Sequence, residues 1–303
     1  MKQDQIYMLF SMLMAITFSA CEAVDPMASE QYRKEIYIVG SYNNVLSFDL
    51  PYGENQEAFI SLAVSGSLKT ERDVNITLAH YDGIISWYNN KYMLDAPVKY
   101  QRLPSESIQI PSWTTTIKAG DIYAHLPFTV NSTGLHCDSL YAIPFAIESV
   151  SDYMKSEQDT TLILTLNLTN EFSGAYQMEA TKSALTEDEN GQWSEVGLPI
   201  PVSIQRTLTA VSADTVRFFH EKEKETLSEY SNSWNPGEDY FNAINNYCIQ
   251  FGKVAGTNTF TVEPWGVMDI KDGEATFSNN TFTFWYDYMQ GTIRYRMKGT
   301  FRK

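Results

Sequence analysis

The chain has 303 residues, of which 43% are apolar, 14% aromatic and 19% charged. This apolar share excludes a disordered chain, and the length is enough to bury a core in each of one to three domains. The net charge of −15 argues against general affinity for nucleic acid, because binding to phosphates requires basic surface.

The first segment has the features of a targeting signal. Residues 6–18 form an uncharged apolar run that fits a signal-peptide core and is too short to span a bilayer as a helix. The small residues Ser19 and Ala20 then precede Cys21, a pattern that resembles the lipobox of bacterial lipoproteins, although Phe18 stands where Leu is usual. In that family the Cys is lipidated and becomes the mature N-terminus. The alternative is an ordinary secretory signal followed by a chance Cys.

We therefore expect residues 1–20 to be a lipoprotein signal peptide, Cys21 to be the lipid anchor and residues 21–32 to be a flexible tether. No later segment has transmembrane length, so the body of the protein is expected to reach the membrane only through lipid. Cys137 and Cys248 lie far apart in the chain. Two buried free thiols are expected, and a bridge between them stays open.

After the tether the chain breaks into short strand-like runs between Gly, Pro and Asp. Residues 74–80 alternate apolar and polar side chains, and residues 161–168 place four Leu on one face. Residues 114–118 and 122–130 flank an Ala-Gly-Asp turn and predict a hairpin. Strands at this short spacing predict a β-sandwich over residues 33–169.

A second strand set opens at Gly174 and predicts a further β domain over residues 173–303. Its last two strands, residues 281–288 and 292–301, each have one apolar face. A two-residue turn at Gln290-Gly291 predicts that these strands form a hairpin that closes a small barrel or sandwich. The predicted cross-strand pairs are Phe284 with Met297, Tyr286 with Tyr295, Trp285 with Arg296 and Asp287 with Arg294.

Five motifs of the first half carry a resemblance to a known family. They are Tyr37-Ile38-Val39-Gly40, Ala63-Val64-Ser65-Gly66, Trp87-Tyr88-Asn89-Asn90, Ile117-Lys118-Ala119-Gly120 and Tyr141-Ala142-Ile143-Pro144-Phe145. With them the first half resembles the N-terminal domain of unknown function found in surface lipoproteins of gut Bacteroidetes, which also precedes family 18 glycoside hydrolase domains. The second half, from Gly174-Ala175-Tyr176 to Lys298-Gly299-Thr300-Phe301-Arg302-Lys303, resembles the lipocalin- or calycin-like module that often accompanies it.

The resemblance implies an all-β chain, with an immunoglobulin-like β-sandwich followed by an antiparallel, lipocalin/calycin-like β-barrel domain. It also implies a polysaccharide-utilisation setting at the outer membrane, and it supplies no binding residue. Such lipoproteins often carry an acidic stretch after the Cys that directs surface display, whereas here only Glu22 and Asp25 are present. The cell surface is the expected location, and the periplasmic face of the outer membrane stays open.

The residues offer no motif for catalysis, a cofactor or a metal. There is no Gly-x-Ser-x-Gly elbow, no phosphate-binding glycine loop and no closely spaced Asp/Glu signature of family 18 hydrolases. Two carboxylates at a suitable separation would still serve an unfamiliar glycosidase. His136-Cys137-Asp138 combines three ligand types, but adjacent residues on a strand point to opposite faces and cannot all bind one ion. We therefore expect no catalytic residue, cofactor or metal site.

Sugar-binding proteins stack aromatic side chains on pyranose rings and place amides and carboxylates beside them. Three segments with this composition are expected in loops, namely residues 87–92, residues 231–237 and the surroundings of Trp265. The predicted glycan-binding residues are Trp87, Tyr88, Asn89, Tyr92, Trp234 and Trp265. The alternative is that these aromatic side chains cap the β core.

A further pattern is Asp, then Ser or Thr, then a small or aliphatic residue, at which similar Bacteroidetes proteins are O-glycosylated. It predicts modification of Ser139, Thr160 and Thr215. Average composition alone produces about one chance match.

The sequence thus predicts a non-catalytic, lipid-anchored cell-envelope protein. It would bind glycan, or assist a polysaccharide-utilisation system beside the partner proteins of a glycan-uptake complex. Three alternatives stay open: an adhesin-like scaffold that mediates protein contacts, an unrecognised glycosidase, and a barrel that encloses a small apolar ligand.

Overall fold

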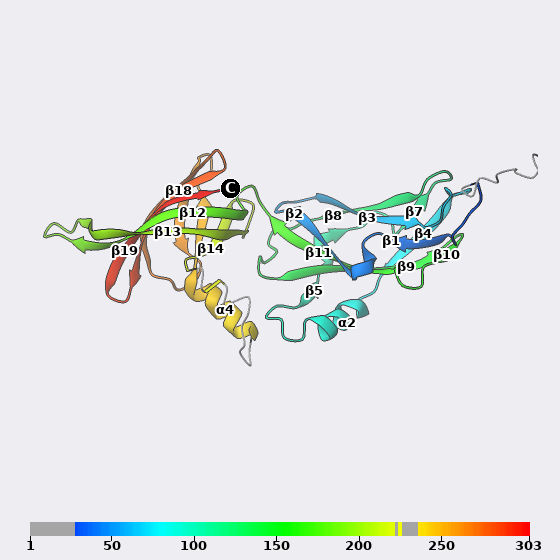
Figure 1. Cartoon of the computed structure of the whole chain (residues 1–303), viewed down its shortest axis with the longest axis horizontal. Helices are drawn as coiled ribbons and strands as arrows, with labels where there is room; N and C mark the ends of the chain where they lie inside the picture. The colour runs from blue at the N-terminus through cyan, green and yellow to red at the C-terminus, as the bar shows by residue number, and fades with distance from the viewer. Residues whose placement is uncertain (1–27, 222–223, 226–235) are drawn as a thin grey trace, which may run out of the picture.

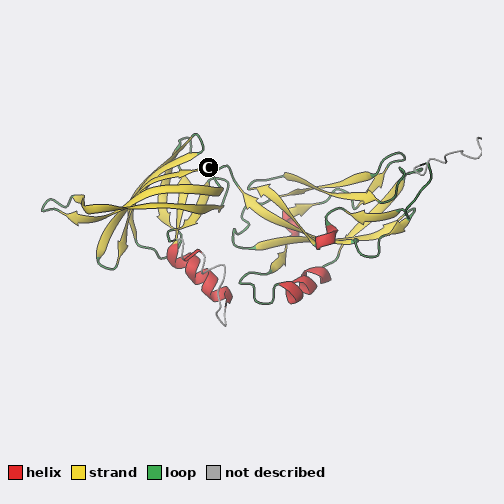
Figure 2. Cartoon of the chain, in the orientation of Figure 1, coloured by secondary structure: helices red, strands yellow, loops and turns green. Residues whose placement is uncertain are grey.

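The computed structural model describes residues 28–221, 224–225 and 236–303. Two β domains follow one another along the long axis of the molecule (Figure 1). Strands make up most of both domains, and the helices lie outside the sheets (Figure 2). The prediction of an all-β chain, with a sandwich followed by a barrel, is confirmed.

The first domain is a sandwich of two sheets. Among the described residues, one sheet has the strand order β10-β1-β3-β8-β6, and the other has the order β2-β11-β9-β4-β7, with β5 paired to β9. The strands of the first sheet are β1 (Glu35–Ile38), β3 (Gln56–Val64), β6 (Ile108–Gln109), β8 (Tyr123–Val130) and β10 (Met154–Lys155). Those of the second are β2 (Val45–Pro51), β4 (Val74–His80), β5 (Tyr100–Arg102), β7 (Thr114–Ile117), β9 (Leu140–Val150) and β11 (Thr161–Thr169). The helical segments are η1 (Ser41–Asn43), α2 (Gly83–Tyr92) and η2 (Ser105–Ser107).

The sandwich core forms because apolar residues recur on the inward face of each strand. Leu162, Leu164 and Leu166 on β11 are buried, in agreement with their predicted common face. They belong to the same buried cluster as Ile36 on β1 and Leu126 on β8, which come from the opposite sheet. The two inner faces therefore interdigitate into one core.

The prediction of a hairpin over residues 114–130 is wrong. β7 pairs with β4 in one sheet, whereas β8 pairs with β3 in the other. The turn at Gly120, with φ of 88°, carries the chain from one sheet to the other. Alternation shows which face of a strand is apolar but not which strand lies beside it, because strands that face each other across a sandwich share the same pattern.

The second domain is a closed antiparallel barrel. In the part of the chain that the structure describes, eight strands pair in chain order, and β12 pairs with β19 to close the barrel. They are β12 (Gly174–Glu187), β13 (Trp193–Ala210), β14 (Thr215–Phe219), β15 (Cys248–Lys253), β16 (Thr259–Pro264), β17 (Ile270–Ser278), β18 (Thr281–Gln290) and β19 (Ile293–Arg302). Helix α4 (Pro236–Tyr247) comes between β14 and β15.

The C-terminal hairpin forms with a register two residues away from the predicted one. Its turn is Gly291-Thr292, and Gly291 adopts a φ of 63°, the left-handed conformation that tight hairpin turns favour. A shift of two residues keeps every side chain on its predicted face, because the side-chain period of a strand is two. The observed pairs are Phe284 with Gly299, Trp285 with Lys298, Tyr286 with Met297 and Asp287 with Arg296.

Aromatic side chains fill the interior of the barrel. The ring centroid of Phe251 lies 5.4 Å from that of Phe282 and 6.1 Å from that of Phe301, and Phe284 stacks on Phe301 at 4.6 Å. These are the separations of rings in direct contact. Where these rings pack there is no space for an enclosed apolar ligand, which argues against that alternative.

His220 is a titratable side chain that is buried in this barrel. His220 Nδ1 lies 2.9 Å from the hydroxyl oxygen of Tyr286. Burial, together with the positive charges of Lys182 and Arg206, lowers the pKa of His220 to about 3. The folded barrel therefore keeps the imidazole neutral, whereas the unfolded chain protonates it below a pH of about 6.5.

We expect the free energy of unfolding to decrease as the pH falls from about 6.5, because only the unfolded chain gains a proton on His220. The contribution of this residue to the slope approaches about 1.4 kcal/mol per pH unit. His220→Gln keeps a polar partner for Tyr286 and cannot titrate, so that part of the slope should vanish. Urea unfolding at a series of pH values measures the slope of the unfolding free energy against pH. An unchanged slope in the variant would contradict the assignment of this contribution to His220.

A buried ion pair joins the two domains. Asp138, in the loop before β9, accepts hydrogen bonds of 2.5 and 2.6 Å from the two terminal nitrogens of Arg217 on β14. The two side chains are only 3% and 4% exposed. The Arg217 guanidinium also lies 4.8 Å from the ring centroid of Trp265. Separation of the domains would leave both charges without their partner, so the pair favours one arrangement of the domains.

Asp138→Asn should lower the free energy of unfolding by about 3–5 kcal/mol, because the Arg217 charge would stay buried without its counter-ion. Asp73→Asn is the matched control, since it breaks the exposed ion pair with Lys118 and water already screens that pair. Urea denaturation of both variants compares the two losses. Equal losses of unfolding free energy in the two variants would show that the buried interdomain pair contributes no more to stability than an exposed pair.

Candidate functional site

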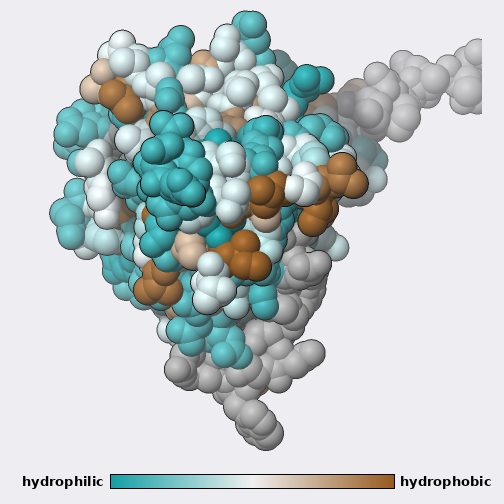
Figure 3. Space-filling view, turned by 90° about the vertical axis from the view of Figure 1, so that its left-hand side faces the viewer, coloured by the Kyte–Doolittle hydropathy of each residue, from teal (hydrophilic) through white to brown (hydrophobic). Residues whose placement is uncertain are grey.

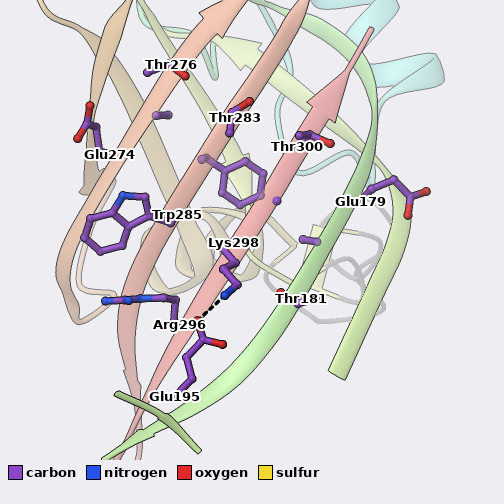
Figure 4. Close-up of a pocket in the computed structure, with 14 residues that line it drawn as sticks. Glu179, Thr181, Glu195, Glu274, Thr276, Thr283, Trp285, Arg296, Lys298 and Thr300 are labelled. Carbon is purple, nitrogen blue, oxygen red and sulfur yellow. Dashed lines mark hydrogen bonds and ion pairs between the residues drawn. The ribbon is translucent and has the colours of Figure 1, made fainter. Parts of the chain in front are cut away.

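A groove crosses the outer wall of the barrel where β17, β18, β19 and β12 run side by side (Figure 4). Its volume is about 920 Å³. The outward side chains of these four strands line it, together with Glu195 from β13. The groove therefore belongs to the barrel domain alone.

The groove lies over a row of small residues that face the barrel interior. Ala180, Gly299 and Ala275 share this row with Phe284 across the four strands. A Cβ atom on Gly299 would lie 2.2 Å from the backbone carbonyl oxygen of Glu179. Only glycine therefore lets β19 approach β12 so closely, and glycine at such a place allows the wall to curve.

Two outward rows of side chains form the groove surface. Cross-strand pairing places Glu179, Thr300, Thr283 and Thr276 in one row. It places Thr181, Lys298, Trp285 and Glu274 in the next. Neighbouring strands lie about 4.8 Å apart, so each row spans about 14 Å. Within the described residues the four threonine hydroxyls have no hydrogen-bond partner.

A buried charge holds Trp285 in position. The guanidinium of Arg296 lies 4.7 Å from the indole centroid and donates hydrogen bonds of 2.7 and 3.0 Å to Asp287. Asp287 is fully buried and accepts a further hydrogen bond of 2.8 Å from Arg294. The hydrogen bond to Asp287 raises the pKa of Arg296. The guanidinium is thus fixed against one face of the indole.

An ion pair lies beside Trp285 on the neighbouring strand, drawn as a dashed line in Figure 4. Lys298 donates a hydrogen bond of 2.5 Å to Glu195, which also accepts one of 2.9 Å from Ser183. The hydrogen bond from Lys298 lowers the pKa of Glu195, so this carboxylate stays ionised. The Glu274 carboxylate has no such partner in the described part of the chain.

Gly299→Ala should destabilise the barrel by about 1–3 kcal/mol, because the added methyl group meets backbone of the neighbouring strand and forces the strands apart. Gly252→Ala is the control. Its Cβ would meet side-chain hydroxyl oxygens alone, of Thr261 at 3.2 Å and of Thr215 at 3.9 Å, and should cost less. Thermal unfolding measures both variants, and a fully stable Gly299→Ala would refute the close-approach argument.

The predicted aromatic loop at residues 87–92 is part of helix α2. Ile84 and Ile85 are buried against Ile163 of β11, and this apolar contact holds the segment as a helix against the sandwich. Trp87 is 43% exposed, and its ring centroid lies 5.7 Å from that of Tyr92.

The other two predicted residues of α2 face the domain. Tyr88 packs on the buried cluster below the helix. The Asn89 side chain exchanges hydrogen bonds of 2.8 and 3.1 Å with the backbone of Tyr100. Asn89 therefore fastens α2 to β5, and Trp87 and Tyr92 are the exposed members of the set.

The remaining predicted aromatic residues do not join α2. Trp234 lies outside the described residues. Trp265 follows β16 and packs on Arg217 at the interdomain contact, with its ring centroid 6.3 Å from that of His136. Trp285 is not among the predicted binding residues, although the strand pattern already placed it on the solvent face of the last hairpin.

The predicted O-glycosylation sites occupy three different environments. Ser139 follows Asp138, whose carboxylate is bound to Arg217. Thr215 is the first residue of β14, and Thr160 lies in the turn before β11. All three acceptor residues are half-buried.

His136, Cys137 and Asp138 lie in a turn, so the strand argument against a shared ion does not apply to them. Their ligand atoms lie within 4.8 Å of one another. The Arg217 guanidinium, however, already occupies the Asp138 carboxylate, and a second cation there would be repelled. Burial also raises the pKa of the Cys137 thiol to about 11, which disfavours the thiolate that metals bind. The cluster is better explained as part of the interdomain contact.

Both described cysteines are free thiols, and Cys248 is fully buried. No helix in the described ranges combines the length and apolar character needed to cross a membrane.

The chain is therefore a two-domain all-β protein whose barrel carries a groove on its outer wall. A family model described as an N-terminal domain matches residues 32–154, and a model described as a C-terminal domain matches residues 160–302. The two matches together span nearly all of the described chain, with one domain model on each half. The resemblance to two-domain Bacteroidetes proteins of unknown function is confirmed.

Three solved structures illustrate the similarity. A multidomain protein including DUF1735 from Bacteroides ovatus is 17% identical with a TM-score of 0.57, and the match covers 89% of this chain and 94% of that chain. A second Bacteroides ovatus structure of unknown function is 12% identical with a TM-score of 0.61 and the same coverage. An auxiliary nutrient binding protein from Bacteroides thetaiotaomicron is 16% identical with a TM-score of 0.53, covering 85% of this chain and 90% of that chain.

At these identities the likeness establishes the fold. No protein with a curated description matches the sequence. The first is named for its DUF1735 domain, the second for unknown function and the third for auxiliary nutrient binding.

Proposed function

We propose that this protein is a non-catalytic, lipid-anchored component of the cell envelope that binds glycan in the outer-wall groove of its barrel. The observation that carries the proposal is the fixed indole of Trp285 beside two rows of hydroxyl and carboxylate groups. An indole face supplies an apolar surface for a pyranose ring, and the polar rows supply partners for its hydroxyls.

The groove is prepared for a ligand before the ligand arrives. Arg296 covers one face of the indole and is itself bound to the buried Asp287. Trp285 therefore has little freedom to lose on binding, and its second face is the one left for a sugar. Side chains ordered in advance reduce the entropy cost of association.

The expected anchor explains how such a groove would be displayed. Cys21 and the tether lie outside the described residues, apart from the end of the tether. There Glu30 pairs with Lys34 at 2.9 Å and accepts a hydrogen bond from Ser67. The body thus begins close to residue 30, which leaves a short segment after Cys21 to reach the membrane. This arrangement suits a protein that assists glycan uptake at the outer membrane.

The Glu195 carboxylate of the groove does not suit the general acid of a glycosidase. A glycosidase needs a protonated carboxylic acid with a raised pKa as its general acid. The hydrogen bond from Lys298 moves the pKa of Glu195 in the opposite direction. The named nutrient-binding neighbour is consistent with capture rather than cleavage.

A second candidate function is a scaffold role in protein contacts, and the outer arm of β13 favours it. β13 pairs with β14 only at Thr209 and Ala210, so the arm before them has β12 on one side only. Val196, Leu198 and Ile200 on this arm are 41%, 93% and 58% exposed. Figure 3, which views the barrel end, shows apolar groups among hydrophilic ones on this side of the molecule. Exposed apolar side chains on a strand arm are typical of a protein contact.

Trp285→Ala should weaken glycan binding about tenfold or more, as expected for the loss of a central aromatic contact. Affinity electrophoresis of the full chain in detergent against a panel of polysaccharides would find the ligand, and titration calorimetry would measure the loss. The matched control is Trp87→Ala on α2, which removes an exposed tryptophan from the other domain. Circular dichroism would confirm that both variants are folded.

If a polysaccharide retards the protein, and Trp285→Ala abolishes this retardation while Trp87→Ala preserves it, the result would support the groove as the binding site. The reverse pattern would move the site to α2. A folded protein that no polysaccharide retards would favour the scaffold role instead.

A further inference from the structure

The positive charges that line the groove already have partners. Lys298 is bound to Glu195, and Arg296 is bound to Asp287. An anionic ligand would therefore have to break an existing ion pair before it gained a cation. For Arg296 that step would leave the Asp287 carboxylate buried with Arg294 as its remaining partner, which is unfavourable.

The remaining charges of the groove repel anions. Glu179 and Glu274 lie at opposite ends of the two outward rows, on β12 and β17. Glu179 accepts a hydrogen bond from Ser203, whereas Glu274 has no partner within the described residues. An ionised carboxylate only accepts hydrogen bonds, so it suits the hydroxyl of a sugar and repels a uronate or sulfate group. The net charge of −15 on the whole chain acts in the same direction.

Uncharged donors and acceptors lie between these carboxylates. The hydroxyls of Thr300, Thr283 and Thr276 occupy consecutive strands in one row, next to Trp285 in the other. Each hydroxyl donates one hydrogen bond and accepts others, which matches the hydroxyl groups of a neutral sugar. A row of about 14 Å accommodates a short stretch of a glycan chain rather than a single ring.

From this juxtaposition we infer that the groove selects an uncharged glycan segment, which lies across β12, β19, β18 and β17, and that it rejects glycans rich in uronic acid or sulfate. The inference rests on the proposed function, because it specifies the ligand class of the same groove. Trp285 provides the stacking surface, the threonine hydroxyls and Glu274 hold the sugar hydroxyls, and the groove carboxylates exclude polyanions.

A panel of neutral and anionic polysaccharides provides the test. The neutral probes are galactan, mannan, dextran and laminarin. The anionic probes are polygalacturonate, heparin and hyaluronan. Affinity electrophoresis of the full chain in detergent, run at low and high salt, should show retardation only by a neutral member. That retardation should change little with salt, because no ion pair forms on binding.

A charge-reversal variant separates selectivity from simple binding. Glu274→Lys should weaken binding of the neutral glycan several-fold and should allow retardation by polygalacturonate that disappears at high salt. Glu148→Lys makes the same change in net charge at an exposed position of β9 in the other domain, and it should leave both results unchanged.

The outcomes distinguish the two proposals. Retardation by a polyanion that Trp285→Ala abolishes would overturn the selectivity and leave the groove as the binding site. Retardation by polygalacturonate in both lysine variants would show a general charge effect and would also overturn it. Retardation by neither kind of polysaccharide would remove the proposed function, and the inference with it.

Discussion

The close approach of β19 to β12 at Gly299 is the constraint on which the barrel and its groove both depend. The backbone carbonyl oxygen of Glu179 occupies the space that any Cβ atom on Gly299 would need. Closure of an antiparallel barrel brings its first and last strands together, and here they meet across this contact. The same contact places Glu179 and Thr181 beside Thr300 and Lys298, which complete the two rows of the groove. Because residue 299 is a glycine, without a side chain, the barrel can close and the two rows of the groove can lie side by side.

Two buried Asp–Arg contacts have different consequences because of what surrounds them. Asp138 and Arg217 come from different domains, so their pairing restricts how the domains are arranged. Asp287 and Arg296 lie on adjacent strands that are already paired, so their contact adds little to the fold. It instead fixes the guanidinium against Trp285. Burial of charge costs desolvation free energy in both places, and in both places the buried pair specifies one geometry.

The sequence was sufficient to predict which side of a strand is buried, but not which strands lie together. The leucines of β11 and the aromatic face of β18 were assigned correctly because side-chain alternation is local. The β7–β8 hairpin was wrong, and the last hairpin was displaced by two residues, because pairing depends on contacts that alternation does not encode. Composition also suggested a loop at Trp87, whereas burial of Ile84 and Ile85 makes a helix there. Trp285 was identifiable as a solvent-facing residue, but its threonine and glutamate neighbours come from strands whose order only the closed barrel reveals.

The groove lies on the closure seam, so the proposed ligand binding would be linked to the stability of the barrel. Its surface combines β12, at the start of the domain, with β19, at the end of it. In the unfolded chain these segments are separated by more than a hundred residues, so the two rows exist only when the barrel is closed. A ligand that bridges them binds the folded state alone and must therefore stabilise it. A site inside the barrel would compete with the aromatic core for the same space, whereas a site on the outer wall leaves that core intact. A small barrel with an aromatic core can therefore still offer its outer wall to the proposed ligand.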